Sequence, residues 1–342
     1  MRVTIREVAD KAGVSVATVS RVFNSTAPVS NATRSRVFEA AAALRYSPNL
    51  AARSLITRRT HTLGILLPDL HGEFFSELMR GIDEIANQSG YHLLVSNSHN
   101  DGHAIEIATR NMRGRVDGLI LMAPEIDRDF LASVVPDHTP VVLVNSWLEL
   151  EGRDSLRVDN YRGAYEMVLH LRAHGHRRIA LLRGADSNFD ARERQRGYRA
   201  ALRDSGGEWS EALELPGDFR EASGYSGALQ LLALPQPPTA FFCSNDSMAI
   251  GVLSGLRTMG VRVPDGVAVA GFDDIPIAAY MTPTLATVRV RISELGARAC
   301  RQLLHAVQHE NRHQPIREVI PTELIPRQSC GCRRVNAEQR AS

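Results

Sequence analysis

The amino-acid sequence predicts an all-α helix-turn-helix headpiece followed by an α/β core of two Rossmann-like lobes with parallel sheets. Residues 4–24 have the pattern of two short amphipathic helices joined by a glycine turn. From residue 62 onward, short apolar runs alternate with amphipathic helix patterns, which is typical of parallel sheets covered by helices. Residues 1–60 carry ten basic and three acidic residues, whereas the remainder carries 30 basic and 35 acidic ones. A basic head therefore precedes an acidic body.

The first helix is expected to begin after Thr4, because Thr4 and Glu7 have the spacing of a capping box. Gly13 permits a tight bend, and Ser15 is a favourable N-cap for the second helix. A third helix is expected after Ser30. The spacing of apolar residues predicts the buried faces of these helices: Ile5, Val8, Ala9, Ala12, Val19, Val22, Phe23, Val37, Ala40, Ala41 and Leu44.

The second helix leaves Val16, Ala17, Ser20 and Arg21 facing outward. If it is a recognition helix, Val16 and Ala17 contact thymine methyl groups, and Arg21 donates to guanine O6 and N7 in the major groove. The basic head favours such a polyanion partner, and its binding should depend steeply on salt. The pattern alone leaves a second interpretation open, namely an ordinary helical hairpin with a polar surface.

In the core, strands are predicted at residues 63–67, 92–96, 118–122, 141–145, 179–182, 240–244 and 267–271. Helices are predicted at residues 73–89, 162–174, 193–205 and 247–259. This is more than one typical domain holds, so we expect two lobes divided near Asp159. In sheets of this kind, ligands bind beyond the carboxyl ends of the strands.

Aromatic, acidic and amide side chains gather at those predicted strand ends. Their planar rings and hydrogen-bonding groups suit a polyhydroxylated ring, whose faces stack and whose hydroxyls need partners. Single residues also have structural interpretations: Phe74 and Phe75 in the core, and Asp246 and Asp273 as helix caps. The candidate effector-binding residues are Asp69, Phe74, Phe75, Asn97, Trp147, Asn188, Asp190, Arg194, Phe219, Asn245 and Asp273.

The sequence contains no nucleophile elbow, phosphate loop or zinc-protease motif, so we expect no enzyme and no cofactor. Two histidine clusters, His305/His309/His313 and His170/His174/His176, are interpreted as solvated helix faces. The Cys330-Gly331-Cys332 sequence is interpreted as inert, and no metal site is expected. Without an apolar signal-peptide core or a run of about 18 apolar residues, the protein is expected in the cytoplasm, associated with the nucleoid.

Seven segments occur in the order seen in the LacI/GalR family of bacterial transcriptional regulators, which the chain resembles over essentially its whole length. The segments are IREVADKAGVSVATVSRVFN, RYSPNLAARSL, VDGLIL, ARERQRGY, NDSMAIG, VPDGVAVAGFDD and TPTLATVR. The resemblance implies a periplasmic-binding-protein-like core whose lobes are joined by three crossings, with residues 289–321 returning to the first lobe. Arg194 and Asp273 match effector-contacting positions.

The resemblance also implies the domain boundaries. Residues 1–46 are expected to form the headpiece, residues 47–61 a linker with a hinge helix, and residues 62–332 the effector-binding and dimerisation core. The first lobe is expected at about 62–160 and 291–321, and the second at about 161–290 and 322–332. Residues 333–342 are expected to be a disordered tail, too short for the heptad helix of a tetramer.

By resemblance, the protein is expected to repress a carbohydrate-utilisation operon as a homodimer on a palindromic operator centred on a CG step. Paired hinge helices would enter the minor groove, where Leu55 would wedge open the central step. The effector is expected to be a sugar; a purine or nucleoside is the alternative, and a sugar-transport protein is disfavoured by the basic headpiece and the missing signal sequence. The expected DNA contacts are Thr4, Ser15, Val16, Ala17, Thr18, Ser20, Arg21, Asn24, Arg34, Ala51, Arg53 and Leu55.

Overall fold

The computed structural model describes residues 3–24, 27–46, 59–135, 139–145, 152–309 and 313–332. The chain divides into two compact units, Met1–Thr60 and His61–Ser342. Several sequence-based predictions lie outside the described residues: most of the linker with Ala51, Arg53 and Leu55, the side chain of Asn24, Trp147, and the tail.

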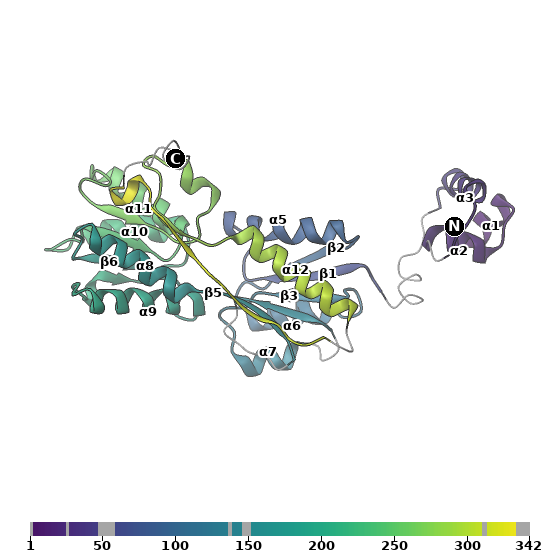
Figure 1. Ribbon diagram of the computed structural model, residues 1–342, viewed down its shortest axis with the longest axis horizontal. Helices are drawn as coiled ribbons and strands as arrows, with labels where there is room; N and C mark the ends of the chain where they lie inside the picture. The colour runs from purple at the N-terminus through teal and green to yellow at the C-terminus, as the bar shows by residue number, and fades with distance from the viewer. Residues whose placement is uncertain are drawn as a thin grey trace, which may run out of the picture. The chain divides into compact units, whose positions relative to one another are not determined.

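The first unit consists of the helices α1 (Ile5–Ala12), α2 (Val16–Asn24) and α3 (Asn31–Ala43) (Figure 1). The capping box is present, because the Thr4 hydroxyl accepts from the Glu7 amide and the Glu7 carboxylate accepts from the Thr4 amide at 2.6 Å. Gly13 ends α1 at φ 63°, in the left-handed region. Val8, Val19 and Val37 are fully buried where the three helices meet. The predicted helix-turn-helix is confirmed.

The first lobe of the second unit contains a six-stranded parallel sheet in the order β11-β5-β4-β3-β1-β2. Its strands are β1 (Thr62–Leu67), β2 (His92–Asn97), β3 (Gly118–Leu121), β4 (Val141–Val144), β5 (Asp154–Val158) and β11 (Arg317–Ile320). Helices α5 (Glu73–Gln88) and α12 (Ile292–Gln308) cover one face, and α6 (Gly102–Met112) and α7 (Arg128–Val134) cover the other (Figure 1). Ile65 and Leu66 are both fully buried, in the apolar clusters of opposite faces, so β1 is buried on both of its faces.

The second lobe contains a four-stranded parallel sheet in the order β7-β6-β8-β9. Its strands are β6 (Ile179–Leu182), β7 (Glu214–Leu215), β8 (Ala240–Cys243) and β9 (Ala268–Ala270). Helices α8 (Asn160–Ala173) and α9 (Phe189–Asp204) pack together, as do α10 (Glu221–Leu232) and α11 (Asp246–Thr258). Short 3-10 turns complete the lobe: η1 (Glu211–Leu213), η2 (Pro276–Ala279) and η3 (Gln328–Cys330).

The strands β10 (Thr287–Arg289) and β12 (Glu323–Ile325) pair with each other in antiparallel orientation. In the sequence, β10 comes just before the segment that returns to the first lobe, and β12 comes just after it. Between them, the chain forms α12 and β11, which pack into the first lobe. Buried Asp274 ties the two passes together, because it forms ion pairs with Arg289 and Arg327, both at 2.7 Å.

The sequence-based list of strands omitted β5, β7, β10, β11 and β12. The strand β5 reads DSLRV, which contains Asp and Arg and lacks an apolar run, yet it pairs with β4 and β11. Helices α8 and α9 begin earlier than predicted, at Asn160 and Phe189, because the side chains of Asp159 and Asn188 cap them. Strand pairing thus explains a strand, and side-chain caps explain two helix starts, that the periodicity of apolar residues does not predict.

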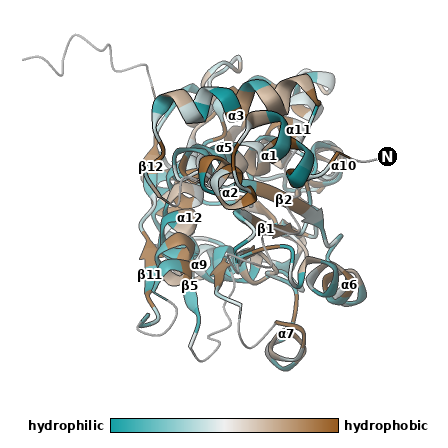
Figure 2. Ribbon diagram, turned by 90° about the vertical axis from the view of Figure 1, so that its right-hand side faces the viewer, coloured by the Kyte–Doolittle hydropathy of each residue, from teal (hydrophilic) through white to brown (hydrophobic). Residues whose placement is uncertain are grey.

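Figure 2 shows β1 and β2 as largely hydrophobic strands, whereas α3 and α6 carry both hydrophilic and hydrophobic positions. Among the described residues, no helix is both long enough and apolar enough to cross a membrane. Helix α6 has the two-sided character of an element that covers a sheet, and it packs against β1 and β2.

The close approach of α5 and α12 yields a stability prediction. A Cβ at Gly296 would lie 2.2 Å from the Leu78 carbonyl oxygen, so Gly296→Ala should lower the free energy of unfolding by about 1 to 3 kcal/mol despite alanine's better helix propensity. Chemical denaturation of the full chain measures this. Arg301→Ala, at an exposed position of the same helix, is the control and should change stability little; equal effects of the two substitutions would contradict the packing.

Candidate functional site

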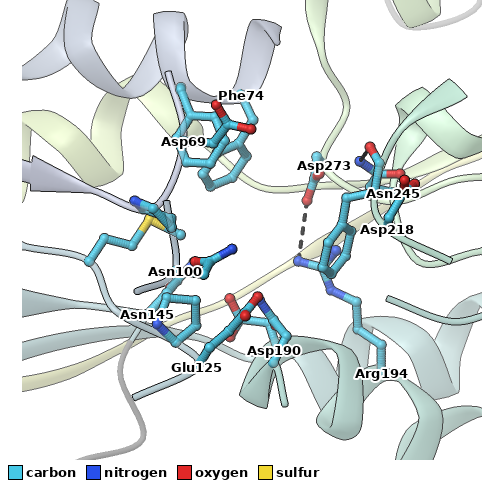
Figure 3. Close-up of a pocket in the computed structure, with 16 residues that line it drawn as sticks. Asp69, Phe74, Asn100, Glu125, Asn145, Asp190, Arg194, Asp218, Asn245 and Asp273 are labelled. Atoms are coloured by element: carbon cyan, nitrogen blue, oxygen red, sulfur yellow. Dashed lines mark hydrogen bonds and ion pairs between the residues drawn. The ribbon is translucent and has the colours of Figure 1, made fainter. Parts of the chain in front are cut away.

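A cavity of about 140 Å³ lies between the two lobes. This volume is comparable with a cavity that accepts a single benzene-sized ring. Figure 3 shows side chains from both lobes pointing into it. The cavity is lined by Pro68, Asp69, Phe74, Phe75, Asn100, Met122, Pro124, Glu125, Asn145, Asn188, Asp190, Arg194, Asp218, Phe219, Asn245 and Asp273.

Nine of the eleven candidate effector-binding residues line this cavity: Asp69, Phe74, Phe75, Asn188, Asp190, Arg194, Phe219, Asn245 and Asp273. Asn97 does not. Its Oδ1 accepts from the His99 amide at 2.9 Å and shapes the loop, which places Asn100 at the cavity instead. Trp147 lies outside the described residues.

Sequence reasoning missed seven lining residues: Pro68, Asn100, Met122, Pro124, Glu125, Asn145 and Asp218. Asn145 directly follows a strand, so the strand-end rule had a signal for it. Glu125 and Asp218 had none, because they lie in irregular loops whose course depends on the packing of both lobes.

Arg194 is the centre of a buried network. Its Nε donates to Asn160 Oδ1 at 2.7 Å, and its Nη1 donates to the Ser244 carbonyl. Its Nη2 lies 3.3 Å from Asp273 Oδ1, an ion pair drawn as a dashed line in Figure 3. The guanidinium also lies over the Phe272 ring, 3.8 Å from its centroid. These contacts fix the guanidinium in one orientation.

The carboxylates of Asp190 and Asp273 share this network. Asp190 Oδ1 accepts from Asn160 Nδ2 at 2.8 Å. Burial raises the pKa of Asp190 to about 7, although the Arg194 charge opposes the shift. Burial likewise raises the pKa of Asp273 to about 6, again against Arg194. Asp273 Oδ1 is buried, and its contact in the described residues is the 3.3 Å ion pair with Arg194 Nη2, which does not have hydrogen-bond geometry. This oxygen therefore retains capacity to accept from a ligand donor.

Four residues of the cavity wall adopt positive φ angles although none is glycine: Asn100 at 56°, Asn145 at 48°, Phe219 at 66° and Asp273 at 106°. This region is sparsely populated for residues with a Cβ, and such strain gathers at ligand-binding sites. Its repetition around one cavity indicates that the surrounding fold holds these side chains in place for binding.

Asn188 and Asn245 have structural roles as well as lining the cavity. Each caps a helix, because Asn188 Oδ1 accepts from the Ala191 amide at 3.1 Å and Asn245 Oδ1 accepts from the Met248 amide at 2.9 Å. Asn245 Nδ2 also donates to the Phe219 carbonyl at 2.8 Å, which fixes the backbone that carries the Phe219 ring.

Asp246 lies behind the cavity wall. It is fully buried, and its carboxylate accepts from Thr287 Oγ1 at 2.6 Å and from the Ile275 amide at 2.9 Å. A Cβ at Gly271 would lie 2.1 Å from Asp246 Oδ1, so glycine is required there. Burial raises the pKa of Asp246 well above its ordinary value. Asp246 therefore positions the loop of Asp273, and neither aspartate is the helix cap that the alternative interpretation proposed: Asn245 is.

The candidate DNA contacts of the first unit lie on and around α2. Val16, Ala17, Arg21 and Arg34 are exposed, whereas Ser20 is half-buried. Ser15 caps α2, because its Oγ accepts from the Thr18 amide at 3.1 Å and lies 2.9 Å from Thr18 Oγ1. Thr4 is exposed at the start of α1. The structure thus places Val16, Ala17 and Arg21 together at the surface of one helix.

The interpretation of His305, His309 and His313 as one solvated helix face is wrong for His313. Helix α12 ends at Gln308, and His313 lies beyond it with Nε2 2.8 Å from buried Asp154 and Nδ1 3.2 Å from His305 Nδ1. Both ring nitrogens of His313 have partners, so these residues join β5 to the end of α12 rather than converging on one point.

Comparison with known proteins identifies two matching families. Residues 4–49 match bacterial regulatory proteins of the lacI family, and residues 168–330 match the periplasmic binding protein-like domain. The HTH-type transcriptional repressor PurR of Photobacterium profundum is 34% identical over 330 residues, 95% of this chain and 98% of that protein. The ribose operon repressor of Escherichia coli is 35% identical over 320 residues, 93% of this chain and 97% of that protein.

Solved structures agree with these matches. The Lac repressor dimer bound to operator and an anti-inducer superposes with a TM-score of 0.86 at 30% identity, covering 96% of this chain and 99% of that one. The transcriptional regulator CelR in complex with cellobiose superposes with a TM-score of 0.72 at 31% identity, covering 96% of this chain and 100% of that one.

The raised pKa of Asp190 predicts a pH dependence of stability. Since the folded state holds this proton more tightly than the unfolded state, the contribution is present below about pH 4 and is lost as pH rises through about 7. Relative to Asp190→Asn, the wild type should lose about 2 kcal/mol of unfolding free energy between pH 5 and pH 8. Chemical denaturation across this range measures it. Asp83→Asn, at an exposed position, should show no such trend. A pH-independent difference for Asp190→Asn would contradict the burial argument.

Proposed function

The chain belongs to the lacI family of bacterial regulatory proteins, and from this membership we propose that it is a dimeric repressor of a carbohydrate-utilisation operon whose operator affinity a sugar controls. The proposal that the effector is a sugar rests on the lining of the cavity between the lobes. Five acidic side chains, Asp69, Glu125, Asp190, Asp218 and Asp273, line it beside a single arginine.

Such a lining disfavours anionic ligands and offers acceptors to a ligand rich in donors. A sugar hydroxyl donates to a carboxylate, and Asp273 Oδ1 can accept such a donor beside its 3.3 Å ion pair with Arg194. The rings of Phe74 and Phe219 line the same cavity and offer apolar faces for the C–H face of a sugar ring. A neutral saccharide of about one ring fits both the chemistry and the volume.

A purine or nucleoside is the second candidate, favoured by the similarity to repressors named PurR. A planar base would stack on the same aromatic rings and donate its N–H groups to the same acids. A thermal-shift screen with pentoses, hexoses and purine bases separates the two classes, because a bound ligand raises the apparent stability by mass action.

At the DNA end, we propose that α2 enters the major groove. Val16 is 41% exposed near its N-terminus, and its methyl groups could contact a thymine methyl. Arg21 is exposed on the same helix and would donate to guanine O6 and N7. The +7 net charge of residues 1–60 supplies the phosphate attraction.

We propose that the functional domains have the boundaries expected from the sequence: a headpiece at residues 1–46, a linker at 47–61, a core at 62–332 and a tail at 333–342. Under this proposal, the linker forms a hinge helix on the operator, where Leu55 unstacks the central step of a palindrome. Since the target is genomic DNA, we place the protein at the nucleoid.

A palindrome requires a dimer with two-fold symmetry. The structure offers apolar surface for it: Leu94 and Val95 on the edge strand β2 are 37% and 38% exposed, and Ile277 and Tyr280 around η2 are 38% and 81% exposed. Exposed apolar side chains on an edge strand and on a surface turn are typical of a contact with another chain.

Arg21→Ala should weaken binding to an operator selected from random duplexes by about 10- to 100-fold, because a bidentate guanine contact is lost. Binding to non-specific DNA should fall far less. Arg36→Ala, an exposed arginine of α3, is the control and should affect both DNAs alike. Gel shifts at fixed salt measure both. If Arg21→Ala weakened both DNAs equally, α2 would not read sequence.

Asp273→Asn should lower the affinity for the sugar found in the screen by about 10- to 100-fold, since a charged acceptor becomes neutral. Operator affinity without effector should stay unchanged. Isothermal titration measures the first and gel shifts the second, with Asp83→Asn as the control. Wild-type sugar affinity in the Asp273→Asn variant would mean that the effector binds elsewhere.

A further inference from the structure

Two sequence features that sequence reasoning set aside separately lie side by side in the structure. His170 is in the last turn of α8 and His174 is its C-cap, whereas Cys330 and Cys332 follow strand β12 near the other end of the sequence. His170 Nε2 lies 3.3 Å from Cys330 Sγ, at a separation of 160 residues. It lies 3.6 Å from Cys332 Sγ, and His174 Nε2 lies 3.3 Å from the same sulfur.

These distances match the edges of a tetrahedral zinc site. With Zn–N near 2.0 Å and Zn–S near 2.3 Å, neighbouring nitrogen and sulfur ligands are about 3.5 Å apart. The three observed N···S separations, 3.3, 3.6 and 3.3 Å, lie around this value. The ligand atoms of His170, Cys330 and Cys332 all lie within 4.8 Å of one another. His174 is not in this group of three and approaches it through Cys332.

Local backbone geometry presents the four ligands. His170 and His174 are four residues apart on one helix, so their rings share a face and their centroids are 4.4 Å apart. Gly331 at φ 90° turns the chain between the two cysteines, in a region that favours glycine. The local backbone therefore holds the two histidines close together and the two cysteines close together, and the fold brings these two pairs into contact.

His174 also has the outer contact that zinc-bound histidines need. Its Nδ1 lies 2.9 Å from the His170 carbonyl oxygen, which only accepts, so Nδ1 carries the proton. In the neutral ring this leaves the Nε2 lone pair facing Cys332. Such a contact fixes the tautomer and orientation of a metal-binding ring.

The four residues form a partly buried site that a metal ion can reach from solvent. Cys330 is buried, His170 and Cys332 are half-buried, and His174 is exposed, so one side opens to solvent. None of the four lines the cavity between the lobes. The 3-10 turn η3 ends at Cys330 and packs against β9, so a metal here would join the C-terminal segment to α8 within the second lobe.

We propose that His170, His174, Cys330 and Cys332 form a structural Zn²⁺ site that fastens the C-terminal segment to α8. Two thiolates and two imidazoles are a ligand set that zinc prefers, and a closed set of four leaves no open position for catalysis. On binding, both thiols release their protons to solvent, and the 3.1 Å hydrogen bond from the Cys330 thiol to the Arg327 carbonyl is replaced by the Zn–S bond.

The test uses the full chain, reduced with a phosphine and stripped by a chelator. Reloaded protein should retain about one Zn²⁺ per chain after desalting, and Co²⁺ in its place should give the absorption bands of tetrahedral thiolate coordination. Zn²⁺ should raise the midpoint of thermal unfolding. Cys332→Ser and His174→Ala, at accessible positions, should each weaken Zn²⁺ binding by more than about 100-fold in competition with a chromophoric chelator.

His103→Ala, an exposed histidine on α6, is the matched control and should bind Zn²⁺ as the wild type does. Retention of less than about 0.1 Zn²⁺ per chain by the wild type, or equal binding by Cys332→Ser, would overturn the proposal. So would a Cys330–Cys332 disulfide that persists in the phosphine-reduced protein, because thiolates would then be missing.

Discussion

The buried ion pair between Arg194 and Asp273 is the interaction on which the cleft depends. Arg194 comes from α9 and Asp273 from the loop after β9, and the same guanidinium binds Asn160 at the start of α8 and the carbonyl of Ser244 after β8. Four segments of the second lobe thus meet at one cation. Removing either charge would leave the other buried without a partner, which costs far more than the pair itself contributes. Asp273 Oδ1 makes this ion pair without a hydrogen bond of good geometry, and Asp273 lines the cavity, so its carboxylate can also accept from a ligand.

The lobes also contact each other around the cavity, so a ligand between them acts on their relative arrangement. Asp69 of the first lobe lies 3.3 Å from Arg220 of the second, Glu73 accepts from the Ile277 amide at 3.0 Å, and the Phe189 amide donates to the Pro124 carbonyl at 3.1 Å. The first two are polar contacts at the surface, individually weak and easily exchanged, whereas Pro124 is buried. In the proposed mechanism, the effector favours one arrangement of lobes over another, and the paired hinges respond.

The sequence predicts structure correctly where a local pattern is compatible with one conformation. It does not predict structure that depends on contacts between distant segments. The Thr4 capping box and the apolar run of β1 determine structure by themselves, and the ends of predicted strands located eight lining residues. Glu125 and Asp218 lie in loops without pattern, and β5 becomes a strand only because neighbours pair with it. The His170 and Cys330 pairs each looked inert alone, because the contact between them spans 160 residues and exists only in the folded second lobe.

Under the proposed function, a ligand in the cleft changes the affinity of the headpiece for DNA, and thermodynamic linkage between the two sites can be measured. Operator affinity is measured with and without saturating effector, and effector affinity is measured on the free and on the operator-bound protein. Both affinities should change by the same factor, on the order of 5- to 150-fold, because coupling between two sites is reciprocal. Operator affinity that is independent of effector, while the effector binds in the cleft, would contradict it.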